Sequence, residues 1–362
     1  MEILWLSIRK RDDLSSSTQQ GILSILASNG HRVRFVGPAG THGQGFFDCE
    51  HIELPQKNKW GRRTSSFAQE VIAWLEIEAP TCDLIFLDWP LYTFLRSALS
   101  RLPAPKILID RSPPASGGIL STAQWSHWKQ AWKAASKGYF SAGCVVSPSH
   151  RAFVTHRYGE IHVPLIEIPA GVSVCSDEPR PYSSPVELVY HGRLDRNRGL
   201  STMFEFVNMA KKRGIAVRLT LYGTGNFVES IKKNQSEQIH YGGNIEQHRM
   251  QLELEKFHVG LLPMPASKVW SIASPLKQNE YLAAGLPILG IDHEGHRMAG
   301  QGEYVQLFSQ EDFCSFAVQF LDQLDESSYH QFSKNALDYA KNHCLWEQRC
   351  KDVLDFLSSL QE

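Results

Sequence analysis

The fold is decided by residues 186–223, which read VELVYHGRLDRNRGLSTMFEFVNMAKKRGIAVRLTLYG. An apolar strand is predicted over 186–192, followed by a polar loop, an amphipathic helix over 200–214 and a second strand over 215–223. Strand, loop, helix and strand in this order form the unit from which parallel sheets with helices on both faces are built. The stretch therefore predicts an α/β protein.

The same unit is present near the start of the chain. A strand is predicted over 1–8, a helix over 19–30 and a strand over 31–37, and a Pro- and Ser-rich segment at 178–185 separates this half from the next. All α/β proteins repeat such units, but here one stands near the start of each half. Because 362 residues are long for one core, we predict two doubly wound Rossmann-like domains that face a central cleft.

Composition excludes several classes of protein. Hydrophobic residues make up 42% of the chain, and no apolar run approaches the roughly 18 residues that a membrane span needs. The first residues predict a strand and no signal peptide. A net charge of −1 argues against a nucleic-acid-binding protein, and seven scattered cysteines without a CxxC pair favour buried thiols in a reducing cytosol. We therefore expect a cytoplasmic location.

A second stretch, SPLKQNEYLAAGLPILG at 274–290, suggests where a ligand binds. Ser274 is a suitable N-cap and Pro275 suits the first helical position, while Gly285 ends a short helix before a buried strand. The first turn of a helix carries partial positive charge from its unpaired N–H groups, so Lys277 has the unfavourable sign there. We infer that an anion binds at this helix start.

Two loops that follow predicted strands are also suited to close contact with a ligand. Gly192 allows close backbone approach, and Arg193 and Arg198 can each donate two hydrogen bonds to phosphate oxygens. Gly223 and Gly225 suit a tight turn after the next strand. Each loop is weak evidence alone, because basic residues in polar loops are more often solvated. Ligands of doubly wound sheets nevertheless bind at the carboxyl ends of the strands.

The order of these segments resembles the donor half of retaining glycosyltransferases of the GT-B, family 4 type. The resemblance covers the second half of the chain well and is sparse in the first half. It rests on six segments: IPAGV at 168–172, HGRLDRNRG at 191–199, LYGTGNF at 221–227, IHYGGNI at 239–245, VGLLPM at 259–264 and the stretch at 274–290.

The resemblance implies roles for individual residues. Arg193 would contact the diphosphate of a nucleotide sugar, and Arg198 would replace the lysine that the family usually has there. Glu280 would accept hydrogen bonds from the ribose hydroxyls. The full set of nucleotide-binding residues implied is Gly192, Arg193, Arg198, Gly223, Asn244, Ile245, Ser274, Pro275, Leu276, Lys277 and Glu280, with the Ser274, Leu276 and Lys277 amides at the phosphates and Asn244 and Ile245 beside the base.

Two positions depart from the family pattern. The family has paired glutamates separated by seven residues, and Ile272 occupies the place of the first, which usually helps to hold the donor sugar. Asp110 follows a predicted strand where relatives often have a polar residue that points into the cleft. Asp110 could contact a sugar, or it could be an ordinary turn residue.

The activity implied is retaining transfer of a sugar from a UDP- or GDP-sugar to a glycan or lipid-linked acceptor, in glycan or polysaccharide biosynthesis. Catalysis would rest on Arg193, Arg198, Lys277 and Asp110. No convincing DxD motif is present, so we expect metal-independent catalysis with no cofactor. The alternatives are a nucleotide-sugar epimerase of the same layout, a non-catalytic nucleotide-sugar sensor and, less well supported, a dinucleotide-dependent oxidoreductase.

The expected domains are an acceptor-binding domain over 1–168, a nucleotide-sugar-binding domain over 169–344 and a helix over 345–362 that packs back on the first domain. The first 168 residues carry 18 Lys and Arg against 14 Asp and Glu, which suggests transient binding of an anionic membrane surface. Candidate contacts are 56–63, QKNKWGRR, and the predicted helix with Trp125, Trp128, Trp132, Lys129, Lys133 and Lys137. For that helix we favour the interpretation that the tryptophans face the core and the lysines face solvent.

Overall fold

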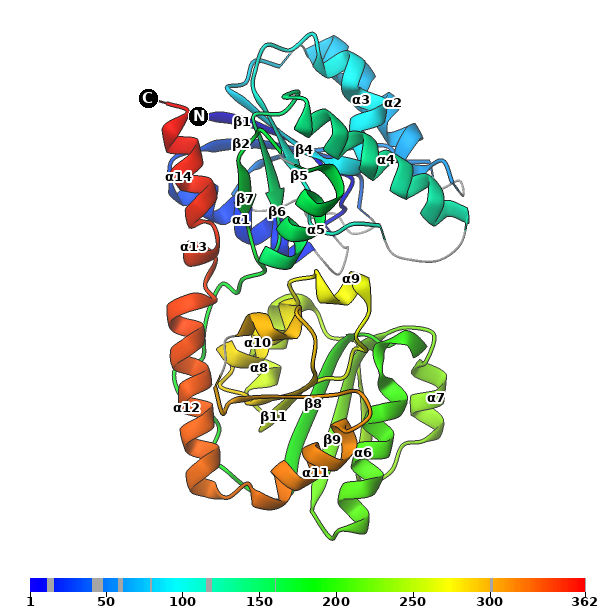
Figure 1. Ribbon diagram of the computed structural model, residues 1–362, viewed down its shortest axis with the longest axis vertical. Helices are drawn as coiled ribbons and strands as arrows, with labels where there is room; N and C mark the ends of the chain where they lie inside the picture. Colours follow the sequence, from blue (N-terminus) through cyan, green and yellow to red (C-terminus); the bar gives the residue numbers. More distant parts are fainter. Residues whose placement is uncertain are drawn as a thin grey trace. The chain divides into compact units, whose positions relative to one another are not determined.

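The computed structural model describes residues 1–11, 16–40, 48–57, 61–78, 80–114, 119–159, 161–299 and 302–361. The chain divides into two compact units. One comprises Met1–Pro169 together with Arg349–Glu362, and the other comprises Ala170–Gln348 (Figure 1). Each unit is an α/β domain built on a parallel sheet, as predicted.

The first unit has a seven-stranded sheet in the order β3-β2-β1-β4-β5-β6-β7, with every neighbouring pair parallel. Its elements are β1 (Glu2–Leu6), α1 (Ser16–Ser28), β2 (Arg32–Pro38), β3 (Glu50–Leu54), α2 (Arg63–Glu78), β4 (Leu84–Asp88), α3 (Tyr92–Leu99), β5 (Lys106–Ile109), α4 (Ile119–Ser136), β6 (Ala142–Val145), α5 (Pro148–Tyr158) and β7 (Leu165–Glu167).

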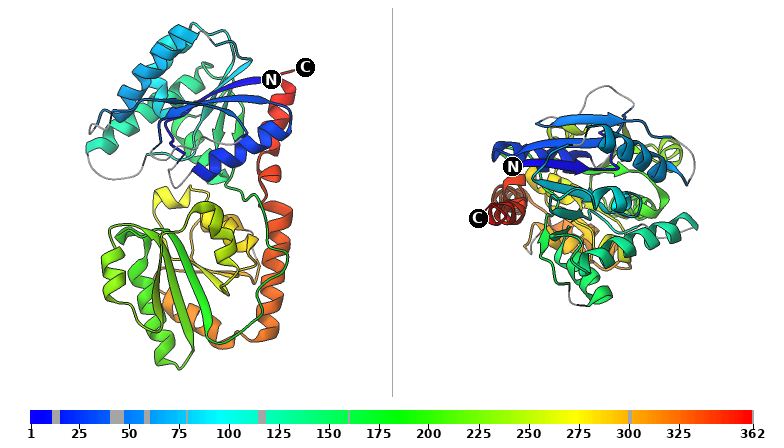
Figure 2. Two further views of the ribbon diagram at one scale, coloured as in Figure 1. Left: turned by 180° about the vertical axis from the view of Figure 1, so that it is seen from behind. Right: turned by 90° about the horizontal axis from the view of Figure 1, so that it is seen from above.

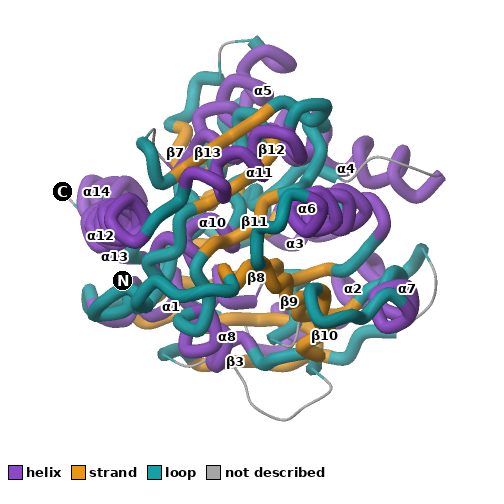
Figure 3. The backbone as a smooth tube through the Cα atoms, turned by 90° about the horizontal axis from the view of Figure 1, so that it is seen from below, coloured by secondary structure: helices purple, strands orange, loops and turns teal. Residues whose placement is uncertain are grey.

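The second unit has a six-stranded parallel sheet in the order β10-β9-β8-β11-β12-β13. Its strands are β8 (Val186–Arg193), β9 (Val217–Thr224), β10 (Ile239–Gly243), β11 (Val259–Leu262), β12 (Ile288–Ile291) and β13 (Val305–Phe308). Its helices are α6 (Leu200–Lys212), α7 (Val228–Lys233), α8 (Gln247–Leu254), α9 (Lys268–Ser271), α10 (Leu276–Ala283), α11 (Phe313–Gln323) and α12 (Glu326–His343). Figure 3 shows β8, β9 and β10 side by side.

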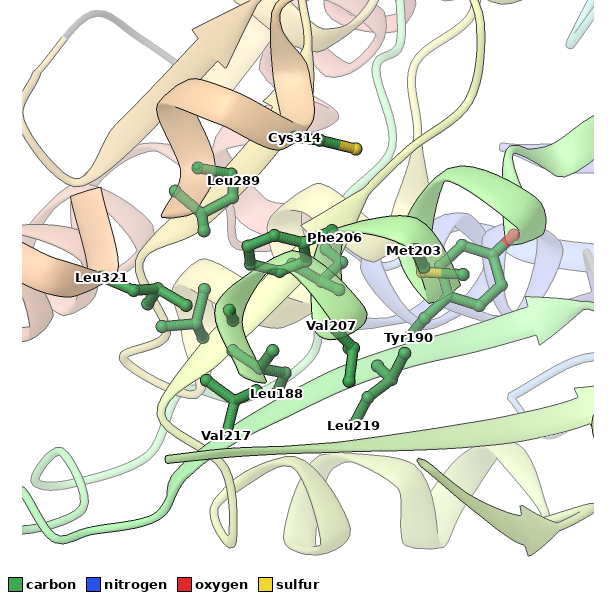
Figure 4. Close-up of a cluster of buried hydrophobic side chains, with 14 of the residues drawn as sticks. Leu188, Tyr190, Met203, Phe206, Val207, Val217, Leu219, Leu289, Cys314 and Leu321 are labelled. Carbon is green, nitrogen blue, oxygen red and sulfur yellow. The ribbon is translucent and has the colours of Figure 1, made fainter. Parts of the chain in front are cut away.

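Helices cover both faces of the second sheet because alternate residues of each strand are apolar on opposite faces. Leu188 on β8 packs with Phe206 of α6 (Figure 4). Phe313 of α11 belongs to the same buried cluster. Val189, one residue further, packs on the other face with Tyr281 of α10 and the helices around it. The predicted doubly wound, Rossmann-like architecture is therefore confirmed.

Both sheets have one topological switch point. The strand order reverses between β1 and β4 in the first unit and between β8 and β11 in the second. At a switch point the two loops that leave neighbouring strands run in opposite directions, which opens a crevice where ligands bind. These two places are where a binding site is expected.

The C-terminal segment returns to the first unit, as predicted. Helix α12 packs on α10, and the short α13 (Trp346–Arg349) leads into α14 (Lys351–Ser359), which packs on β7. Figure 2 shows α14 alongside the first unit. Val353 and Leu357 of α14 are fully buried. The junction is held by Trp346, which is 4% exposed and whose backbone amide donates to the Val172 carbonyl.

The tryptophans of α4 face the core, as favoured from the sequence. Trp128 and Trp132 are fully buried, while Lys129, Lys133 and Lys137 are exposed. In the segment 56–63, residues 58–60, including Lys59 and Trp60, lie outside the described residues.

Candidate functional site

The carboxyl ends of β8 and β9 meet backbone to backbone, next to the switch point between β8 and β11. Gly192 has φ of +116° and Gly223 has φ of +128°, both in the region that favours glycine. A Cβ atom on Gly223 would lie 1.8 Å from the carbonyl oxygen of Gly192. Only glycine fits at Gly223, and the close approach leaves the strand ends without side chains to cover them.

Lys277, in the first turn of α10, lies against this glycine pair. A Cβ atom on Gly192 would be 3.1 Å from the Lys277 Nζ atom, and Nζ is 5.3 Å from the centroid of the Tyr190 ring. Burial, with the nearby positive charge of Arg198, lowers the pKa of Lys277 to about 8, while the Glu280 carboxylate acts in the opposite direction. A buried lysine with a lowered pKa is stabilised in its charged form by a bound anion.

Arg198 supplies a second cation beside Lys277. Its guanidinium carbon lies 4.0 Å from the centroid of the Trp270 ring, and its Nη1 donates to the Met264 sulfur at 3.6 Å. Within the described part of the chain, its buried Nε has no hydrogen-bond partner. Burial lowers the Arg198 pKa. The stack on Trp270 holds the planar guanidinium in place and leaves N–H groups for another acceptor.

Arg193 is held differently. Its guanidinium forms a two-point ion pair with Asp195, with Nε to Oδ2 at 3.0 Å and Nη2 to Oδ1 at 3.2 Å. The side chain is 46% exposed. Arg193 and Arg198 are close enough for each charge to affect the other. A diphosphate would therefore meet Arg193 already paired with Asp195, so it would contribute less than Arg198 or Lys277.

Glu280 lies one turn further along α10 and is paired with a residue that the sequence analysis missed. Its Oε2 is 3.2 Å from Nε2 of His191, and the side chains are 10% and 8% exposed. His191 directly precedes Gly192 on β8, so its position at a strand end was the available signal. The pair places one carboxylate close enough to Lys277 for its charge to act on the lysine.

The start of α10 differs by one residue from the prediction. Pro275, with φ of −71° and ψ of 122°, is the N-cap, and Leu276 is the first helical residue. Ser274 does not cap the helix, because its Oγ accepts a hydrogen bond from the Ala170 amide at 2.9 Å. The first-turn amides of an α-helix, here Leu276 and Lys277, have no intrahelical partner. The predicted end is confirmed, with Gly285 at φ of +71° directly after the helix.

Asn244 and Ile245 follow β10, which is separated from β8 by β9. Asn244 is exposed. Ile245 is half-buried and packs against the apolar cluster that contains Tyr222 and Met250. The structure thus places them two strands away from the Gly192 loop, at the same carboxyl edge of the sheet.

Residues 185–326 match the family model described as Glycosyl transferases group 1. The second unit contains a glycosyl transferases group 1 domain. Its matched region contains the Gly192, Arg198, Lys277 and Glu280 cluster, and the domain lies in a chain with the GT-B fold.

Solved structures share the fold of the whole chain at low sequence identity. The pneumococcal O-GlcNAc transferase GtfA, in complex with UDP and GlcNAc, has a TM-score of 0.71 at 11% identity, covering 100% of this chain and 99% of that one. A glycosyltransferase from Rickettsia africae has 0.71 at 12%, covering 100% and 98%. TarM from S. aureus has 0.62 at 13%, covering 80% of this chain, which spans 58% of the TarM chain. No curated protein sequence matches this chain.

Asp110 is not placed to touch a ligand in the described structure, contrary to the predicted sugar contact. Its side chain is fully buried in the first unit. Its carboxylate accepts hydrogen bonds from the indole N–H groups of Trp128 at 2.6 Å and Trp132 at 2.8 Å, and it lies 3.2 Å from Nε2 of His150. The tryptophans of α4 lie against the end of β5, and Asp110 is their buried hydrogen-bond acceptor.

Ile272, at the position where the resemblance places the first of two glutamates, is 6% exposed at the end of α9. A buried aliphatic side chain offers no hydrogen bond to a sugar hydroxyl. This position therefore cannot perform the glutamate's role.

Two further buried histidines of the group 1 domain were missed in the sequence. His293 and His296 follow β12, with ring centroids 3.7 Å apart, and His296 Nδ1 is 2.6 Å from the Ile291 carbonyl oxygen. Burial lowers the pKa of His293 to about 4, and that of His296 to about 3, with Lys277 among the charges acting on His296. No motif marks them, because histidine at a loop start has many structural roles.

Among the described residues, no group of three or more His, Cys, Asp or Glu side chains is arranged to hold a metal ion. None of the described helices combines the length and apolar character needed to span a bilayer.

Proposed function

We propose that this chain is a retaining glycosyltransferase that moves a sugar from a UDP- or GDP-sugar to a glycan or lipid-linked acceptor, without a metal, in glycan or polysaccharide biosynthesis. The observation that carries the proposal is the half-buried Lys277, whose ammonium lies against Gly192, beside the half-buried Arg198. Two half-buried cations at a switch point are suited to a diphosphate, and one of them has an N–H without a partner among the described residues.

The chemistry needs stabilisation of the leaving group. When the bond between the anomeric carbon and the diphosphate oxygen breaks, negative charge collects on the diphosphate and the sugar becomes oxocarbenium-like. Lys277, Arg198 and the first-turn amides of α10 would stabilise that charge, with a smaller contribution from Arg193. The leaving phosphate oxygen would accept the proton of the acceptor hydroxyl, whose oxygen bonds to the anomeric carbon on the same face.

The nucleoside would be held by Glu280. Its carboxylate, positioned by His191 at 3.2 Å, can accept from both ribose hydroxyls, and Asn244 and Ile245 would lie beside the base. GtfA was solved with UDP, and the E. coli trehalose-6-phosphate structure was solved with UDP-2-fluoro glucose. These two neighbours favour uridine over guanosine for the donor.

The protein would work in the cytoplasm and dock transiently on an anionic membrane surface. The exposed Lys129 and Lys133 of α4 and Lys137 just beyond it, together with Lys57 and Arg62, would supply the contacts. Vesicle flotation checks this. Binding that is equal with zwitterionic and anionic lipid would remove the membrane from the proposal.

Ligand titration tests the donor site directly. UDP and GDP, but not NAD, should raise the melting temperature, and Lys277→Gln should abolish the shift, because it removes the buried cation. Lys212→Gln is a matched control, since Lys212 is exposed on α6. Release of UDP or GDP from its sugar in excess chelator then tests turnover without metal. A shift with NAD alone would contradict the proposal.

Ile272 keeps one alternative open, a sensor that binds a nucleotide sugar without turnover, because the position of the first glutamate offers no polar group to the sugar. A sensor would show the thermal shift without donor hydrolysis or transfer. An epimerase would instead convert the donor sugar without an acceptor.

A further inference from the structure

The first unit holds a cavity of about 660 Å³ at the switch point of its own sheet. Its lining comes from the segments that follow β1 and β4, the two strands between which the order reverses, and from the starts of nearby helices. The volume lies within the range of about 300–1,000 Å³ that is usual for small-molecule sites. Position and size therefore both indicate a ligand site.

Positive charge dominates this cavity. Arg9 and Lys10 follow β1, and Arg63 is the first residue of α2. No Asp or Glu is among the described residues that line it. Asp88, whose carboxylate is affected by the charge of Arg9, is buried and accepts hydrogen bonds from Trp5 Nε1 at 3.2 Å and Ser7 Oγ at 2.6 Å.

The start of α2 adds to the positive potential. Arg63 occupies the first helical position of a 16-residue helix, where a cation is disfavoured by the helix dipole unless an anion is present. Thr64 and Ser65, with hydroxyl groups, also line the cavity. Three cations from two separate segments suit a dianion better than a singly charged carboxylate.

The other wall is aromatic. The indole N–H of Trp89 donates to the Ser112 carbonyl at 3.1 Å, which fixes the ring. Phe94 lies with its ring centroid 4.9 Å from that of His127, and His127 Nδ1 is 2.7 Å from Thr93 Oγ1. Fixed aromatic faces with a few polar groups are the usual lining of a pocket for an amphipathic ligand such as a sugar ring.

We propose that this cavity binds the acceptor and that the acceptor is a sugar carrying a phosphate. Arg9, Lys10 and Arg63 pair with the phosphate, and Trp89 and Phe94 pack on the sugar ring. This inference rests on the proposed glycosyl transfer, because the ligand of the cavity is the acceptor only if the protein transfers a sugar. The binding itself requires no donor, so it is measured separately.

The test is calorimetric titration of the full chain at low salt with glucose 6-phosphate, inorganic phosphate, glucuronate and glucose, without nucleotide. We expect glucose 6-phosphate to bind most tightly and glucose not to bind. Lys10→Gln and Arg63→Gln should each weaken glucose 6-phosphate roughly tenfold, the scale of one charge-assisted hydrogen bond. Arg63→Lys should retain more affinity than Arg63→Gln.

Two variants provide matched controls. Arg62→Gln removes the same charge from the exposed neighbour that does not line the cavity, and Lys277→Gln removes the cation of the second unit. Neither should change the affinity for glucose 6-phosphate. A loss in Lys277→Gln with no loss in Lys10→Gln would overturn the proposal, because the phosphate would then bind at the group 1 domain.

Vesicles distinguish a phosphorylated sugar from a membrane surface. Lys10- and Arg63-dependent flotation on phosphatidylglycerol vesicles, without binding of glucose 6-phosphate, would overturn the inference. If nucleotides fail to bind but glucose 6-phosphate binding shows the expected variant pattern, the cavity site stands and the proposed transfer fails. Transfer to glucose 6-phosphate at an unchanged rate in Lys10→Gln would support the proposed transfer and overturn the phosphate-binding cavity as its acceptor site.

Discussion

Lys277 shows how one residue links the local sequence to a ligand. A lysine in the first turn of a helix opposes the helix dipole, and here it is also buried against Gly192 and close enough to Arg198 to be affected by its charge. The helix dipole, the burial and the charge of Arg198 all disfavour the ammonium in the free protein. A bound diphosphate would stabilise the charged form of Lys277. Binding is therefore coupled to protonation of this lysine and depends on pH.

The affinity for UDP should fall as the pH rises above about 8. The pKa of Lys277 in the free protein is about 8, and a diphosphate must raise it by favouring the charged form. Below pH 8 the ammonium is already formed. Above it, binding must take up a proton, and affinity drops by up to about tenfold per pH unit. Calorimetry at pH 9 in buffers of different ionisation heat would show this uptake, which Lys277→Gln should lose.

Glu280 and Lys277 should separate the two halves of a nucleotide. We expect Glu280→Gln to weaken UDP by roughly tenfold while leaving pyrophosphate unchanged, since only the ribose would lose an acceptor. Lys277→Gln should weaken both. Competition binding with UDP and pyrophosphate measures the split. Equal loss of both ligands in Glu280→Gln would argue that the carboxylate merely positions His191 and Lys277.

At the scale of elements, the site beside the switch point depends on the contact between the ends of β8 and β9. The contact between Gly192 and Gly223 cannot tolerate a side chain, because the obstacle to a Cβ atom is a backbone carbonyl and not a movable side chain. This contact arises from the pairing of β8 with β9, and no spacing of residues in the sequence predicts it.

Gly223→Ala should therefore destabilise the second unit by about 3 kcal/mol or more. Gly214→Ala is the matched control, because Gly214 also has positive φ, at +75°, but a Cβ atom there would meet no other atom within 4 Å. Its cost should be only that of the backbone conformation, about 1–2 kcal/mol. Urea unfolding of both variants gives the comparison. Equal costs would mean that the carbonyl contact relaxes freely.

The scale of the whole molecule concerns the segment 345–362, which lies far from β7 in sequence and packs on it in space. Leu357→Ala in α14 should lower the free energy of unfolding by about 2–4 kcal/mol, because the side chain is fully buried. Leu360→Ala, just beyond α14 and 37% exposed, should change it by less than about 0.5 kcal/mol. Urea denaturation measures both, and similar values would contradict the packing of α14 on the first unit.

Acid should destabilise the fold through three buried histidines. Burial lowers the pKa of His258 and His293 to about 4 and of His296 to about 3. Above pH 6.5 these side chains are neutral in both states. Between pH 6.5 and 4 the unfolded chain binds protons that the folded chain does not, so each histidine contributes a loss of up to about 1.4 kcal/mol per pH unit. A melting temperature that is flat from pH 7 to 5 would contradict this.

The buried strands were predictable because burial on both faces leaves apolar runs that local pattern reveals. Two edge strands, β3 (Glu50–Leu54) and β13 (Val305–Phe308), were not predicted, because mixed polarity at a sheet edge blurs that pattern. Ser274 was predicted to be an N-cap, but its hydroxyl accepts a hydrogen bond from the amide of Ala170, 104 positions away. A local pattern cannot reveal such a distant partner.

The sequence by itself determined the α/β class and the doubly wound arrangement of each half, since these follow from short-range periodicity. The grouping of Gly192, Arg198, Lys277 and Glu280 came from the resemblance to retaining glycosyltransferases, which rests on loops at strand ends. Only the tertiary structure decided that Asp110 is enclosed by Trp128 and Trp132, that His191 faces Glu280, and that the segments after β1 and β4 line a basic cavity. The reason is physical: burial and partner distance depend on which distant segments pack together, and no local pattern encodes that.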